Sequence, residues 1–94
     1  MRPALTNQDG KNEDAQALAL SALAWTLADG DRADRLLALT GLDGASLRTR
    51  IGEPAVLAAC LGYLQGYQPD LVACAEAIGS TPERLVAAQE ALER

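Results

Sequence analysis

The sequence predicts a single all-α domain: a compact bundle of about six short helices around a central helix that contains the only tryptophan, Trp25. Three observations support this fold class. Apolar residues recur every three or four positions, with no long period-two alternation. Alanine and leucine, both strong helix formers, supply most of the 49% hydrophobic residues. Glycine, proline and aspartate divide the chain at short intervals, which is typical of short helices joined by tight turns.

The central helix is expected from Ala15 to about Asp29, with Asn12 as its N-cap and Gly30 as its end. Its apolar residues form two stripes at about 100° per residue. One stripe holds Leu20, Leu23 and Leu27, and the nearly opposite one holds Leu18, Ala22 and Trp25. A helix that is apolar on nearly all sides is usually buried, so we expect neighbours on both sides of it.

Five shorter helices are expected over about 31–40, 44–51, 54–65, 69–78 and 82–92. Asp31 and Asp43 are placed to cap the first two, and Gly41 to end the first of them in a left-handed turn. Pro54 suits a first helical turn because its missing N–H would have no partner there. Either Ser80 or Thr81 caps the last helix, and the sequence leaves both open.

Length, charge and cysteine content set further limits. Ninety-four residues suit one domain, which we expect over residues 12–94 after a flexible tail over residues 1–11. The net charge of −5 makes nucleic acid an unlikely partner. With no apolar signal segment and no run long enough to span a membrane, we expect a cytoplasmic protein. Cys60 and Cys74 are expected as reduced core residues, with a redox-switch disulfide as the alternative.

The residue inventory argues against enzymatic activity. The chain has no histidine, which excludes Ser-His and Cys-His pairs and zinc sites of the HExxH type. No P-loop and no GxGxxG motif occurs. Asp29, Asp31 and Asp34 resemble the start of a calcium loop, but the twelfth position is Thr40 rather than glutamate, so capping explains them better. We therefore expect a protein that is not an enzyme, with no cofactor and no metal.

Two segments share the register of a helix-turn-helix. They are LLALTGLDGASLRTRI (36–51) and CAEAIGSTPERLVAAQ (74–89), each with a glycine turn and a leucine six residues after it, Leu47 and Leu85. Arg48 and Arg50 would project from the recognition helix of the first segment. The corresponding helix of the second segment carries Glu83, Glu90 and Glu93 against Arg84 and Arg94, which is the wrong sign for DNA. Nucleic-acid binding through this motif is therefore the alternative function.

A protein-interaction role is the main functional expectation. Tyr63 and Tyr67 lie four residues apart at the end of a predicted helix, and tyrosine is common in interfaces. Together with Arg48 and Arg50, they form the expected interaction surface. The alternative is that Tyr63 packs in the core of the domain and Tyr67 lies in a loop. The sequence identifies neither the partner protein nor the oligomeric state.

The run ALAWTLADGDRADRLLALTGLDGASLRTRIGEPAVLAACLGYL, which begins at Ala22, carries a family resemblance. Its AW and LTGLD elements and its proline-led Leu/Ala helix resemble an alphaproteobacterial family of small helical proteins, domain of unknown function 3572. The resemblance extends from about Ala15 to Leu92, and Thr26 stands where the family pattern has an apolar residue. It implies a cytoplasmic, all-helical protein with no assigned activity and suggests a link to two-component signalling.

Overall fold

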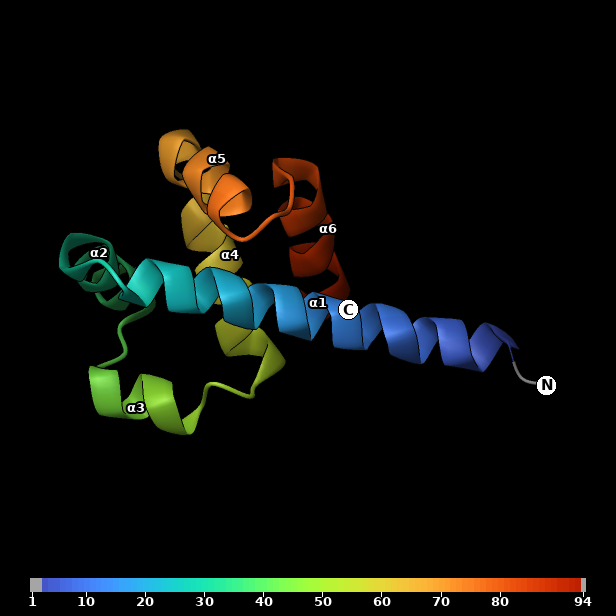
Figure 1. Cartoon of the computed structure of the whole chain (residues 1–94). Helices are drawn as coiled ribbons and strands as arrows, with labels where there is room; N and C mark the ends of the chain where they lie inside the picture. Colours follow the sequence, from blue (N-terminus) through green and yellow to red (C-terminus); the bar gives the residue numbers. More distant parts are fainter. Residues whose placement is uncertain (1–2, 94) are drawn as a thin grey trace.

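The computed structural model describes the backbone of residues 3–93 and the side chains of residues 14–93. Within this range the chain is all-helical and contains no strand, which confirms the predicted fold class. The six helices are α1 (Pro3–Leu27), α2 (Gly30–Thr40), α3 (Gly44–Thr49), α4 (Pro54–Gln65), α5 (Gln68–Ala77) and α6 (Pro82–Glu93). In Figure 1, α1 runs across the molecule with α4 crossing behind it, α5 and α6 on one side and α3 on the other.

The first helix begins earlier than the sequence suggested. It starts at Pro3, so the predicted start at Asn12 is wrong. Proline is well suited to a first helical turn, and an asparagine inside a helix costs less than about 1 kcal/mol relative to alanine, so a potential cap need not be used. Of the expected flexible tail, Met1 and Arg2 lie outside the described residues.

The junction between α1 and α2 also differs from the expectation. The α2 cap is Asp29 rather than Asp31, and its carboxylate accepts a hydrogen bond of 3.0 Å from the backbone N–H of Arg32. Gly30 is then the first residue of α2 and not the residue that ends α1. Both aspartates lie where a cap is favourable, and the sequence pattern does not distinguish two capping candidates only two residues apart.

The later turns follow local sequence rules closely. Gly41 ends α2 with φ of 75°, a left-handed conformation that favours glycine. Asp43 caps α3 by accepting from the N–H of Ser46 at 2.7 Å, and Pro54 begins α4. Thr81 proves to be the cap of α6, because its hydroxyl oxygen accepts from the N–H of Arg84 at 3.2 Å. These positions confirm the predicted boundaries of the middle and last helices to within one or two residues.

Helix α4 occupies the centre of the core. It packs against α1, α2, α5 and α6. Seven of its twelve residues are buried: Val56, Leu57, Ala58, Cys60, Leu61, Tyr63 and Leu64. Near its end, Gly62 faces the Gln89 side chain of α6, whose amide oxygen accepts a hydrogen bond from Gln65. The proline-led helix therefore has neighbours on nearly all its sides.

Helix α1 is buried along one side. Its buried residues between positions 14 and 28 are Ala15, Ala19, Ala22, Leu23 and Thr26. Three of the five are alanines, which let a helix approach its neighbours α4 and α6 closely. The hydroxyl of Thr26 donates to the carbonyl of Ala22 at 2.8 Å, so this buried polar group has a partner. No helix in residues 3–93 combines the length and apolar character needed to cross a membrane.

The expectation of neighbours on both sides of this helix is wrong. Leu20 and Leu27 are 40% and 38% exposed, whereas Leu23, placed on the same stripe, is buried. The buried strip is centred between the two stripes read from the sequence, because packing selects a side of a helix independently of where its largest side chains lie. Trp25 is half-buried and packs at the edge of the core.

Candidate functional site

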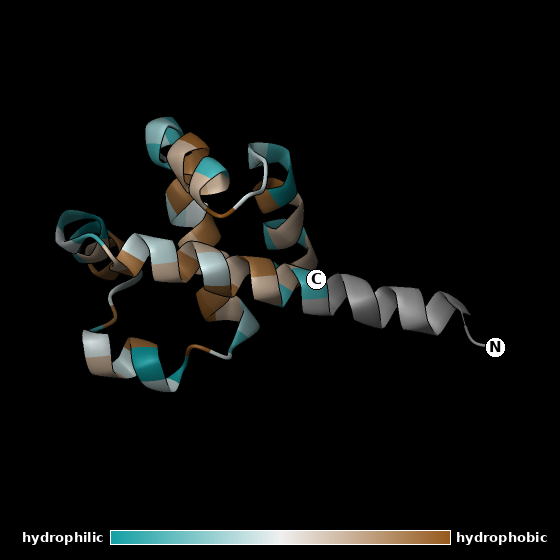
Figure 2. Ribbon diagram, viewed as in Figure 1, coloured by the Kyte–Doolittle hydropathy of each residue, from teal (hydrophilic) through white to brown (hydrophobic). Residues whose placement is uncertain are grey.

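Between Ala15 and Ala28, the exposed side of α1 is an uncharged surface. We call the part that follows the exposed Gln16 the outward face, and its members are Ala17, Leu20, Ser21, Ala24, Leu27 and Ala28. No residue from Ala15 to Ala28 is charged. An exposed helix surface normally carries charged side chains opposite its apolar stripe. Figure 2 shows the C-terminal half of α1 mainly in brown, tan and near-white rather than in the teal of hydrophilic residues.

The spacing on the outward face matches the contact pattern of paired helices. Ala17, Leu20, Ala24 and Leu27 follow one another at intervals of three, four and three residues. This is the a/d spacing of a heptad repeat, in which side chains of one helix insert between those of another. The alternation of alanine with leucine provides small and large residues in turn. The outward face therefore has the pattern of a helix–helix contact but has no helix against it within the described chain.

A groove with a volume of about 770 Å³ lies beside the outward face, between α1 and α6. Alanine side chains line much of it, including Ala15 and Ala17 from α1 and Ala87, Ala88 and Ala91 from α6. Its charged lining residues are Asp14, Arg84 and Glu90. Ala17 and Ser21 belong to both the groove and the outward face, so the two form one continuous surface.

The two tyrosines of the expected interaction surface lie in different environments. Tyr63 is only 7% exposed, and its hydroxyl donates to Asp70 at 2.8 Å. Burial, together with this bond to a carboxylate, raises the pKa of Tyr63 to about 12. Tyr67 is 46% exposed at the start of α5, with the guanidinium of Arg35 5.5 Å from the centre of its ring. Tyr63 thus fits the core alternative, and only Tyr67 offers ring surface to a partner.

The two arginines of that expected surface lie away from the tyrosines. Arg48 and Arg50 are exposed at the end of α3 and just after it, before α4 begins, whereas Tyr67 follows its end. The twelve residues of α4 separate these two ends by about 18 Å at 1.5 Å per residue. Arg50 is paired with Glu53 at 3.0 Å. The structure therefore does not bring the four residues together, and a contribution of any of them to binding stays a prediction.

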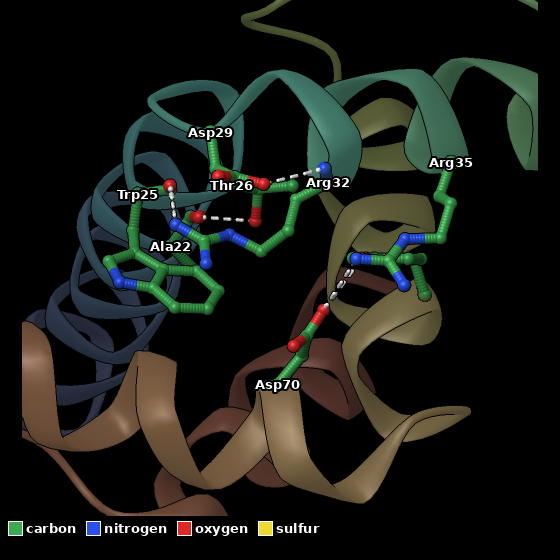
Figure 3. A network of polar contacts seen from close by, with 8 residues as sticks. Ala22, Trp25, Thr26, Asp29, Arg32, Arg35 and Asp70 are labelled. Carbon is green, nitrogen blue, oxygen red and sulfur yellow. Dashed lines mark hydrogen bonds and ion pairs between the residues drawn. The ribbon is translucent and has the colours of Figure 1, made fainter.

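Sequence reasoning missed a polar network between α1, α2 and α5. The guanidinium of Arg32 lies 3.7 Å from the centre of the Trp25 ring, and Arg35, one turn later, reaches Asp70 at 3.9 Å (Figure 3). Cation–π contact with tryptophan is the strongest of its kind. These contacts join α2 to α1 and to α5, so both arginines have a structural role. No sequence signal indicated it. The contact between Trp25 and Arg32 crosses a turn whose geometry the pattern does not specify, and Arg35 and Asp70 lie on helices that are distant in the sequence.

Both cysteines behave as core residues. Cys60 and Cys74 are free and buried. Burial raises the pKa of the Cys60 thiol from its ordinary 9.0 to about 12 and that of Cys74 to about 11. Because the thiolate is the form that attacks oxidants and disulfides, both are protonated and unreactive at neutral pH. This favours the core interpretation over the redox switch.

These shifts predict a loss of stability in alkaline solution. A thiol or phenol whose folded pKa lies above its unfolded pKa destabilises the folded state once it ionises in the unfolded chain. The melting temperature should therefore hold steady up to about pH 9 and fall between about pH 9 and pH 12. Thermal melts followed by circular dichroism test this. The melting temperature of the Cys60→Ala variant should decline less steeply over this pH range. An equally steep decline would contradict the raised pKa of Cys60 as a cause of the alkaline loss of stability.

The helix-turn-helix segments fold as helix, turn and helix, with Leu47 and Leu85 buried. In the first segment, however, α3 has six residues and does not pack closely on α2. In the second, α5 and α6 do pack together, but α6 exposes Glu83, Arg84, Glu90 and Glu93. Neither segment presents a basic helix supported by its partner, and nucleic-acid binding stays the less favoured prediction.

Among residues 14–93, no group of three or more His, Cys, Asp or Glu side chains is placed to hold a metal.

Comparisons with known proteins bear on the family resemblance. No curated protein and no solved structure matches the chain. A family model described as "Protein of unknown function (DUF3572)" matches residues 12–94, which is most of the chain. The chain therefore belongs to the DUF3572 family.

Proposed function

We propose that this chain is a non-enzymatic protein-interaction domain and that the outward face of α1 is its contact surface. The observation that carries the proposal is the uncharged, heptad-spaced face from Ala17 to Ala28. Leaving two half-exposed leucines in water forgoes burial that is worth roughly 1 kcal/mol or more for each. A partner that covers the face would recover this free energy.

Comparison of the two most apolar helices supports the proposal. Both α1 and α4 lack charges over a long stretch, from Ala15 to Ala28 and from Pro54 to Gln65. In α4 most of these uncharged residues are buried, because other helices cover nearly all its sides. Helix α1 is covered on one side only. The same sequence property therefore has a structural explanation in α4, and the exposed side of α1 supports an intermolecular explanation there.

Site-specific photo-crosslinking in cells of the source organism tests the proposal. A photoreactive amino acid is placed at Leu20 or Leu27 on the outward face and, as a control, at Leu39, which is 66% exposed on α2. We expect the same crosslinked protein from positions 20 and 27, with none from position 39. Mass spectrometry then identifies the product as another protein or as a second copy of this chain. Crosslinks absent from both 20 and 27 would contradict the proposed contact surface.

A further inference from the structure

The outward face and the adjacent groove carry features of opposite shape side by side. Leu20 and Leu27 form a ridge, and at about 100° per residue Ala17 and Ala24 lie between this ridge and Ser21, which lines the groove. Leu20 also lies within the stretch of α1, residues 14–21, that borders the groove. A projecting side chain and a hollow therefore lie at the same height on one surface.

We infer that this surface binds a second copy of the chain, an inference that rests on the proposed function and names its partner. An isologous contact uses the same patch on both subunits, so the patch must contain both the projecting group and the hollow that receives it. A two-fold axis parallel to α1 exchanges the two lateral sides of the face. It therefore places the leucine ridge of each copy over the groove of the other. An axis across α1 would instead place ridge against ridge.

The charges on this surface are also compatible with self-association. Each chain has a net charge of −5, so two copies repel wherever they bring like charges together. The outward face contains no charge, which removes that cost at the contact. The charged residues that line the groove are Arg84, Asp14 and Glu90. In this arrangement the groove of each copy faces the uncharged ridge of the other, so these side chains do not bring like charges together across the contact.

The size of the surface sets the expected affinity of the dimer. The twelve residues from Ala17 to Ala28 span about 18 Å of helix. The outward face has six residues and ten line the groove, with two in common, so the surface has fewer residues than the roughly 20–30 per side that stable complexes use. We therefore expect a reversible dimer that forms at micromolar to millimolar concentration rather than a permanent one.

Sedimentation velocity of the purified full-length chain from about 10 μM to about 1 mM tests the inference. The wild type should shift from monomer to dimer across this range. Leu20→Glu, which places a carboxylate on the ridge, should weaken association about tenfold or more. Leu39→Glu adds the same charge on α2, away from the face, and should lower association much less.

A second substitution tests the placement of the ridge in the groove. Ala87 is exposed and lines the groove, so Ala87→Trp fills the hollow without disturbing a buried position. Ala87→Trp should weaken the dimer about as strongly as Leu20→Glu does. If the two leucine ridges instead packed against each other, Ala87→Trp would leave the affinity of the dimer unchanged. Far-ultraviolet circular dichroism verifies that both variants fold.

The outcomes separate this inference from the proposed function. A chain that stays monomeric up to about 1 mM contradicts the second-copy inference. So does a dimer that both variants leave intact. If positions 20 and 27 still crosslink to another protein in cells, the proposed function stands and only the identity of the partner changes. A dimer weakened by both Leu20→Glu and Ala87→Trp supports the inference.

Discussion

Replacing Leu61 by alanine should lower the free energy of unfolding by about 3–4 kcal/mol. Leu61 is fully buried in α4, the helix that packs against four others. The substitution removes buried apolar volume, and the surrounding helices cannot close the cavity without moving against one another. Such a loss is a large fraction of the roughly 5–15 kcal/mol that stabilises a typical domain.

Urea denaturation followed by circular dichroism measures the effect of Leu61→Ala. The matched control is Leu39→Ala, since Leu39 is 66% exposed and its truncation should change the free energy of unfolding by no more than about 0.5 kcal/mol. Equal effects at the two positions would show that α4 is not the centre of the core.

Replacing Ala19 by leucine should destabilise the domain by about 2–3 kcal/mol. Ala19 is completely buried on the side of α1 that faces the core. The added side chain has no space in a contact that alanines keep close, so it must separate α1 from its neighbours or adopt a strained rotamer.

The control for this substitution lies on the same helix. Ala24 is exposed on the outward face, and Ala24→Leu should leave the stability of the monomer within about 0.5 kcal/mol of the wild type. Chemical denaturation at low protein concentration compares the two variants. A larger loss from Ala24→Leu than from Ala19→Leu would mean that α1 docks through the opposite side.

Local features of the fold were predictable from the sequence. Gly41, Asp43 and Pro54 act as expected, because caps and turns depend on bonds between residues a few positions apart. The choice between Asp29 and Asp31 failed because both satisfy the same local rule.

The side of α1 that docks was not predictable. Periodicity shows that a helix has apolar sides but does not say which of them finds a neighbour. Leu23 and Leu27 share a stripe in the sequence, yet only Leu23 is buried.

The candidate site was only partly accessible to sequence reasoning. Tyr63 and Tyr67 were selected as a pair by their spacing, but the bond between Tyr63 and Asp70 places one of them in the core. The missing charge from Ala15 to Ala28 was visible in the sequence. Its meaning depends on tertiary structure, since the same uncharged stretch needs no further explanation in a helix covered on nearly all its sides, as α4 is.

Thiol labelling of a matched pair of variants tests most directly whether α1 has one docked side and one outward side. Ala19→Cys and Ala24→Cys make the same substitution five residues apart on one helix, and the buried Cys60 and Cys74 contribute little background. At low protein concentration a maleimide should modify Ala24→Cys at least about tenfold faster than Ala19→Cys. Equal rates, or faster labelling at position 19, would contradict the account.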